Sequence, residues 1–174
     1  MKKTEIKITP EYYITYINKA GNGNLLDELE EGGIAPFLDN FEKLELLQNK
    51  TYAKGKWTVK EIIEHLIDTE RIFQTRALRF VRQDKTPLPG YDENMYAAVS
   101  RANDRSLEDL LEEYQIVRLS SWQLFKNLDK DQLHFSGIAN GNEISVLAIG
   151  FILIGHAVHH FEVIIEKYFP LLED

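Results

Sequence analysis

Residues 144–162 read ISVLAIGFILIGHAVHHFE, and this stretch decides which kind of fold the chain can form. Its first twelve residues are uncharged, which is fewer than the roughly 20 apolar residues that a helix needs to cross a bilayer. Ser145 is a suitable cap for a helix N-terminus, and Pro170 cannot continue a helix. The stretch therefore predicts a long buried helix that reaches about Phe169.

A second long helix is indicated between residues 58 and 82. Thr58 and Glu61 have the spacing of a capping box, in which each side chain satisfies a backbone N–H of the other residue. Two prolines and a glycine within residues 84–90 then end the helix. The apolar positions recur every three or four residues, as on one face of a helix. They are Ile62, Ile63, Leu66, Ile67, Phe73, Ala77, Leu78 and Phe80.

The rest of the chain is typical of shorter helices and one more long one. We expect a helix that begins at a Thr9–Pro10 cap, a helical turn from Leu25 to Leu29, and a helix over about 33–48. A short lid-like helix is expected over 92–101, and a long one from Ser106 to about Leu128. The dipeptide Asn140–Gly141 predicts a small hairpin within residues 129–143. These patterns predict an all-α protein: a single helical bundle domain, 1–174, with short extra helices and a small hairpin.

The composition excludes several classes of function. The chain has 20 Lys and Arg against 28 Asp and Glu, a net charge of −8, whereas a nucleic-acid-binding protein usually carries a basic surface. The charge therefore weakens the case for nucleic-acid binding, although a local basic patch could survive within the acidic total. It has no cysteine, which excludes disulfides, cysteine-ligated zinc, iron–sulfur clusters and a cysteine nucleophile. No apolar run of export-signal length follows the N-terminus. We therefore expect a soluble, cytoplasmic protein that acts on a small molecule, with no nucleic acid and no membrane as partner.

The histidines carry the chemical signal. His156 and His160 are four residues apart, so they share a helix face with Cβ atoms about 5–6 Å from each other. Two imidazoles at this spacing can bind one metal ion. At about 100° per residue, the pair falls within the apolar stripe of the helix, and His159 falls just outside it. The inward pair is therefore His156 and His160, with His159 at the periphery.

His65 lies in the second long helix and can complete the site. If the two helices run antiparallel, His65 can meet the His156/His160 pair, which would give a three-histidine site with open coordination positions. Open positions are typical of catalytic zinc, because structural zinc is closed by protein ligands. A single histidine on an apolar helix face is more often a hydrogen-bonded core residue, so this interpretation depends on the convergence of all three. His134 stands in a turn-rich stretch, and we expect an ordinary surface role for it.

Several segments of the chain resemble the DinB/YfiT-like superfamily, in the expected order. They are GKWTVKE at 55–61, HLIDTER at 65–71, RALRF at 76–80, TPLPGYD at 86–92 and GHAVHH at 155–160. The resemblance implies a four-helix bundle with a divalent metal, commonly zinc or nickel, in a pocket between helices. As ligands it implies His65, His156 and His160, the trio that the helix faces also favour. Glu162 departs from the glutamine or apolar residue of many relatives.

The resemblance also implies an activity. Characterised relatives include thiol-dependent S-transferases and a thiol-dependent isomerase, in which a low-molecular-weight thiol is activated at the metal. The first interpretation is therefore an S-transferase that joins an external thiol to small electrophiles. A metal-dependent hydrolase with the same ligands, and a non-catalytic metal-binding or stress-related bundle, are the alternatives. Relatives include dimers, and exposed aromatic residues on the first helix would permit a homodimer.

Charged residues around His65 allow two interpretations each. Arg76 and Arg79 lie on or near its helix face, roughly 16–21 Å further along. They can bind an anionic part of a substrate or thiol, or pair with Asp or Glu across the bundle, and we favour the pairing. Glu64 and Asp68 flank His65 and can orient its ring, but solvated helix acids are the simpler interpretation.

Five further side chains have expected places. A pocket rim is predicted from the residues that follow the Pro–Gly loop, which are Tyr91, Asp92 and Tyr96. Trp57 and Trp122 are expected to be core or interface aromatics.

Overall fold

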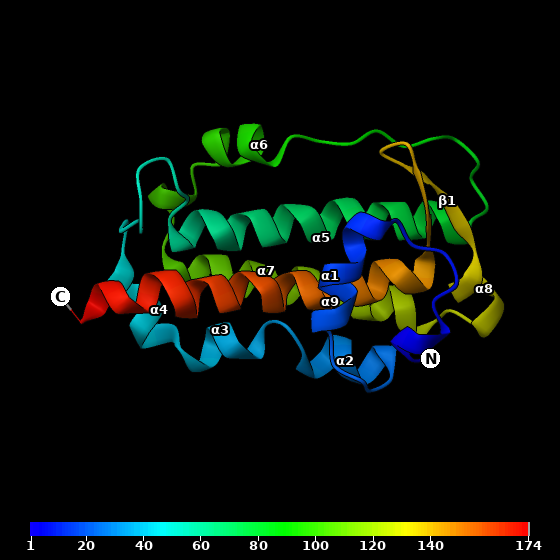
Figure 1. Cartoon of the computed structure of the whole chain (residues 1–174), viewed down its shortest axis with the longest axis horizontal. Coiled ribbons are helices and arrows are strands. Elements are labelled where there is room, and N and C mark those ends of the chain that lie inside the picture. Colours follow the sequence, from blue (N-terminus) through cyan, green and yellow to red (C-terminus); the bar gives the residue numbers. More distant parts are fainter. Residues whose placement is uncertain (174) are drawn as a thin grey trace.

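Three long helices form the frame of the protein, whose computed structural model describes residues 1–173 (Figure 1). They are α5 (Val59–Val81), α7 (Leu107–Lys126) and α9 (Val146–Val163). Helix α5 packs against both α7 and α9. Helix α9 continues as a π-helical turn, Ile164–Tyr168, and a 3-10 turn, Phe169–Leu172. The all-α prediction is confirmed.

The fourth position of the bundle is filled by three short helices in succession. They are α2 (Leu25–Glu31), α3 (Ala35–Asp39) and α4 (Phe41–Leu47), and they follow one another along one edge of the molecule (Figure 1). Helix α2 packs against α7 and α9, which closes the four-membered ring of helices. Gly33 separates α2 from α3 with a φ of 87°, a value that favours glycine.

The predicted single helix over 33–48 is wrong in one respect, because it breaks at Asn40. The Nδ2 of Asn40 donates a hydrogen bond to the carbonyl of Pro36, 2.9 Å away. Asparagine side chains compete in this way with the backbone hydrogen bonds of a helix. The backbone therefore leaves the helical conformation at Asn40, with φ of −113° and ψ of 21°, and α4 begins at Phe41.

Short elements complete the fold. Helix α1 (Ile14–Lys19) follows a 3-10 turn, Glu11–Tyr13, and α6 (Glu93–Val99) lies on the far side of α5. The remaining short helical elements are Lys3–Glu5, Ala102–Asp104 and α8 (Lys130–His134).

The predicted hairpin is confirmed as an antiparallel pair. Strand β1 (Ser136–Ala139) and β2 (Asn142–Ser145) join through Asn140 and Gly141. Both turn residues have positive φ, as a tight hairpin turn requires. Leu88 exchanges backbone hydrogen bonds with Ile138 and Asn140, so the segment between α5 and α6 is fastened to the hairpin.

The predicted caps are confirmed for the long helices and wrong for the first one. Thr58 and Glu61 form the capping box of α5, while Ser106 caps α7 and Ser145 caps α9. The residue before the 3-10 turn Glu11–Tyr13 is Pro10, which has no side-chain donor or acceptor. The Oγ1 of Thr9 is buried and has no hydrogen-bond partner among the described residues.

A polar layer divides the core into two apolar clusters. One cluster surrounds residues 146–154 of α9 and the second half of α5, and the other surrounds the first halves of α5 and α7. Between the clusters lie Glu70, Arg118 and His156, all buried. Buried charges are tolerated only when they are paired and hydrogen-bonded, so this layer has to be well ordered.

All three guanidinium nitrogens of Arg118 donate hydrogen bonds within this layer. Its Nε donates to the two carboxylate oxygens of Glu70 at 2.8 and 3.0 Å. Its Nη1 donates to the carbonyl of Gly32 at 3.1 Å, and its Nη2 donates to the carbonyl of Leu153 and the hydroxyl of Tyr114. One side chain of α7 thus joins α5, α9 and the end of α2.

Helix α1 crosses α9 at a glycine. A Cβ on Gly155 would overlap the backbone carbonyl of Tyr16, so only glycine lets the two helices approach this closely. The crossing places α1 beside the middle of α9 (Figure 1). It positions the tyrosines of the N-terminal segment next to the histidines of α9.

The last helix of the chain is buried, as predicted. Together with the turns that follow it, α9 is long and apolar enough to span a membrane, but most of it lies inside the bundle. Such burial is the pattern of a core helix, so the length and composition of α9 are weak evidence for a membrane span.

The glycine crossing can be tested by substitution. We expect Gly155→Ala to lower the free energy of unfolding by more than about 1 kcal/mol, because the added methyl group meets backbone that cannot rotate away. Gly150→Ala on the same helix is the matched control: there the methyl meets Leu25 Cδ1 at 2.6 Å, the movable end of a side chain. Urea unfolding of both variants measures the difference. Equal losses would contradict the proposed role of Gly155.

Candidate metal centre

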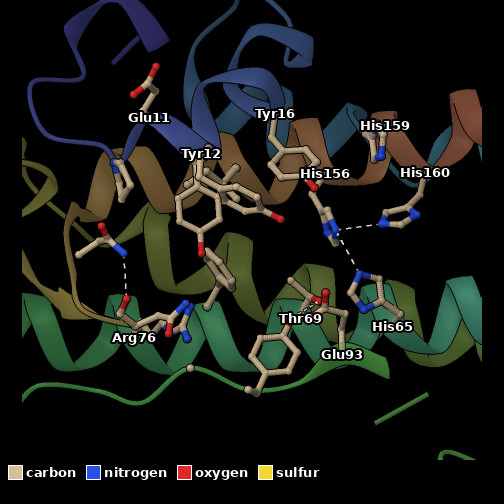
Figure 2. A pocket seen from close by; sticks show the side chains of 18 of the residues that line it. Glu11, Tyr12, Tyr16, His65, Thr69, Arg76, Glu93, His156, His159 and His160 are labelled. Atoms are coloured by element: carbon tan, nitrogen blue, oxygen red, sulfur yellow. Dashed lines mark hydrogen bonds between the residues drawn. The ribbon is translucent and has the colours of Figure 1, made fainter. Parts of the chain in front are cut away.

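The structure brings the three predicted histidines together. His65 comes from α5 and His156 and His160 from α9, which runs antiparallel to α5 (Figure 1). The Nε2 of His156 lies 3.2 Å from the Nε2 of His65 and 3.0 Å from that of His160 (Figure 2). The three residues form a group whose ligand atoms all lie within 4.8 Å of one another.

These separations fit a divalent metal ion. Nitrogens bound at about 2.0–2.1 Å, with angles of about 90–110° at the ion, lie roughly 2.9–3.4 Å apart. Hydrogen bonds alone satisfy the cluster poorly, since the Nε2 of His156 has to serve two neighbouring nitrogens at once. An ion can be bound by the lone pairs of all three rings at the same time. The donor set therefore suits a metal, although three imidazoles do not select one divalent ion by ligand type.

The environment keeps the three rings in the neutral form that binds metals. Burial lowers the pKa of His65 to about 4. Burial, reinforced by the neighbouring histidines, holds the pKa values of His156 and His160 well below the usual 6.5. At neutral pH no proton therefore competes for the ligand atoms.

The other two histidines lie outside this group. The ring of His159 is 5.1 Å from that of His160 and 5.4 Å from that of Tyr16, and it faces away from the three Nε2 atoms (Figure 2). This agrees with the prediction that His159 lies at the periphery. His134 ends α8 and is partly exposed.

Two aromatic residues next to the triad were not predicted as site residues. The ring of Trp57 lies 4.9 Å from that of His65 and is nearly parallel to that of His160. Tyr16 meets the His156 ring edge-on at 5.1 Å. In the sequence, only one feature places Trp57 near the site, which is its position directly before Thr58, the cap of α5. The contact of Tyr16 follows from the α1–α9 crossing, which the sequence pattern does not indicate.

A cavity of about 580 Å³ extends from the triad along α5. This volume is typical of a small-molecule pocket. Its walls include Tyr13 and Tyr16 from the N-terminal segment and Thr69 and Tyr91 on the other side. The hydroxyl groups of Thr69 and Tyr91 are hydrogen-bonded at 2.7 Å, which holds the segment between α5 and α6 against α5.

The predicted rim is confirmed for one of its three residues. Tyr91 lines the cavity. Asp92 instead caps α6, where its carboxylate accepts hydrogen bonds from the N–H groups of Asn94 and Met95. Tyr96 packs against Tyr91, with 5.3 Å between ring centroids, and is half exposed.

The charged residues of α5 differ from the predictions in three cases. Glu64 is not a solvated acid, because it forms a 2.9 Å ion pair with Arg105. Arg79 pairs with Asp84 at 2.6 Å, at the end of its own helix rather than across the bundle. The pairing favoured for Arg76 is wrong: within the described part of the chain, no carboxylate lies within 4.0 Å of it. Its Nη2 donates to the carbonyl of Pro89 instead.

A sequence model of the DinB superfamily matches residues 34–164, which include all three histidines. The chain belongs to the DinB superfamily. No curated protein matches the sequence at a significant level.

One solved structure shares the DinB fold of this chain over nearly its whole length. It is YfiT from Bacillus subtilis, described as a probable metal-dependent hydrolase with an unusual four-helix bundle topology. The two chains are 19% identical, with a TM-score of 0.70 over 95% of this chain and 90% of that one. The likeness confirms the four-helix bundle expected of a DinB protein. The superfamily fits a metal-dependent role, and the histidine triad can hold a divalent metal.

Metal content tests the triad directly. We expect one divalent ion per chain in the wild-type protein, and at least about 100-fold weaker binding in His65→Ala, since removing even an outer partner of a ligand costs 10–100-fold. Competition with a chromogenic chelator measures the affinity. His159→Ala is the matched control and should keep its metal. Equal affinity in wild type and His65→Ala would rule out the three-histidine site.

The depressed pKa values predict how the stability of the metal-free protein depends on pH. The unfolded chain takes up protons on these histidines below about pH 6.5, while the folded chain does so only at lower pH. Their contribution to stability is therefore complete above pH 6.5 and is lost as the pH falls. Between pH 6.5 and 5, the free energy of unfolding should fall more steeply in wild type than in a variant with all three changed to Gln. Parallel curves would contradict this account.

Proposed function

We propose that this protein is a divalent-metal-dependent enzyme that activates a nucleophile beside a small molecule held in the cavity. The observation that carries the proposal is the incomplete ligand set at the cavity wall. His65, His156 and His160 line the cavity, and among the described residues no fourth His, Asp or Glu joins the group. Structural zinc sites have four protein ligands, whereas catalytic sites keep a position open.

The chain's own residues provide the setting for this chemistry. A divalent ion held by three neutral imidazoles supplies Lewis acidity and lowers the pKa of a thiol or water that it binds. Trp57 and Tyr16 place aromatic rings against His65 and His156. Both histidine-bearing helices belong to the core, so the ligands sit on rigid elements.

The nucleophile that we propose is an external low-molecular-weight thiol, and the reaction is S-transfer to a small electrophile. The chain contains no cysteine, so a reacting thiol has to come from outside. The cavity lies against the triad and its volume suits small molecules. Zinc or nickel is the proposed ion, and the cytoplasm, which is rich in thiols, is the proposed compartment.

A second candidate is hydrolysis, with water as the nucleophile at the same ligands. The description of the YfiT structure as a probable metal-dependent hydrolase favours it. Neither reaction needs nucleic acid or a membrane as partner, in keeping with the net charge of −8. Tyr12, which is 70% exposed, would be available for the proposed homodimer.

Turnover assays separate these candidates. Zinc- and nickel-loaded protein is assayed with 1-chloro-2,4-dinitrobenzene or monobromobimane and a panel of thiols, and in parallel with chromogenic esters and amides without thiol. We expect thiol-dependent product formation that is lost in His156→Ala and kept in His134→Ala. Cleavage of esters or amides without thiol would replace S-transfer by hydrolysis. Stoichiometric metal without turnover in either panel would contradict the enzyme proposal and favour a non-catalytic bundle.

A further inference from the structure

Arg76 lies in the cavity at the end opposite the histidine triad (Figure 2). It is eleven residues further along α5 than His65, or about 16 Å at 1.5 Å per residue. Its side chain is only 4% exposed. The guanidinium lies over the Phe73 ring, 4.7 Å from the centroid, and Nη2 donates to the carbonyl of Pro89 at 3.0 Å.

The partners of Arg76 differ from those of comparable arginines in the chain. Arg118 is buried to the same extent and is bound by the carboxylate of Glu70. Arg79 and Arg105, which are more exposed, each have a carboxylate partner as well. Arg76 alone among these four has only neutral partners within the described part of the chain. An unpaired buried charge is costly, so a counter-anion from outside would stabilise it.

The surroundings of Arg76 suit the binding of an anion. Tyr13 and Tyr91 line the same end of the cavity. Burial raises the pKa values of both hydroxyl groups above their usual range, which keeps both protonated. The Tyr91 hydroxyl is hydrogen-bonded to Thr69, so Tyr13 is the tyrosine of the two that we expect to donate to an anion. The carboxylates that also line the cavity, Glu11 and Glu93, belong to exposed residues, where water screens their charge.

We propose that Arg76 binds a carboxylate or phosphate group of an elongated small molecule whose other end reaches the histidine triad. The guanidinium offers planar, paired donors that match both groups. That the far end reacts rests on the proposed function, whereas the binding of the anion rests on Arg76 itself. The anion can belong to the thiol or to the electrophile, and in either case it fixes the direction in which that molecule lies in the cavity.

Binding of simple anions tests the site without any turnover. Inorganic phosphate and succinate, with uncharged succinamide for comparison, are titrated calorimetrically into metal-loaded protein. We expect at least one of the two anions to bind, succinamide not to bind, and the affinity to fall about tenfold or more in Arg76→Gln. Arg76→Lys, which keeps the charge but not the paired donors, should fall between them and remains informative if the Gln variant does not fold. Arg79→Gln is the matched control and should bind as wild type does.

Two results would overturn the proposal. One is that wild type binds neither anion, or binds them no better than Arg76→Gln or Arg76→Lys does. The other is that His65→Ala loses the anion while Arg76→Gln keeps it, which would place the anion at the metal. If the anion binds through Arg76 but no reaction is found, the proposed function fails and the anion site stands.

Steady-state kinetics then separate the two sources of the anion. Mercaptosuccinate and 2-mercaptoethanol differ mainly in the carboxylates of the former. If the thiol carries the anion, Arg76→Gln should raise the KM for mercaptosuccinate and leave that for 2-mercaptoethanol unchanged. If the electrophile carries it, the KM for a carboxylated electrophile should rise instead. A variant that lowers kcat equally for all pairs, with no change in KM, would contradict a role in binding either substrate.

Discussion

The buried ion pair between Arg118 and Glu70 is the constraint on which the rest of the structure depends. Both side chains are almost completely removed from water, where a charge is tolerated only if its hydrogen bonds are satisfied. Arg118 meets this condition through a carboxylate on α5, a carbonyl on α9, a carbonyl at the end of α2 and a hydroxyl on its own helix. These partners coincide only when the helices have one relative position along their axes. We infer that the pair favours this register of the bundle, because its partners come from three different helices.

The same register assembles the candidate metal centre. Glu70 follows His65 by five residues on α5, and Leu153 precedes His156 by three residues on α9. A helix arrangement that satisfies Arg118 therefore also brings His65 to the His156/His160 pair. The layer is closed on the Arg118 side, where a carboxylate balances the charge. On its other side lies the cavity, whose walls include the three neutral imidazoles and, further along α5, Arg76. The charge of Arg76 has no carboxylate partner among the described residues. The histidine triad and Arg76 thus line the same cavity, so that one bound molecule could contact both.

Much of the frame and the centre of the site could be predicted from sequence, because they depend on local periodicity. The capping box at Thr58 and the i, i+4 spacing of His156 and His160 fix where a helix begins and which face a side chain occupies. The features that were missed depend on contacts between distant segments. Tyr16 reaches His156 only because Gly155 lets α1 approach α9. Arg76 lacks its expected acid because the segment after α5 folds back and presents the carbonyl of Pro89. The break at Asn40 depends on a side-chain bond to the backbone that competes with a regular helix.

We propose that one divalent ion binds between His65, His156 and His160 and keeps a position open toward the cavity. The most direct test is a crystal structure of the zinc-loaded protein, with the ion located by anomalous scattering at the zinc edge. We expect a single strong peak about 2.0–2.1 Å from the Nε2 atoms of all three residues, with a non-protein ligand on the cavity side. A zinc ion held elsewhere, or one whose coordination is closed by a fourth protein side chain, would contradict it.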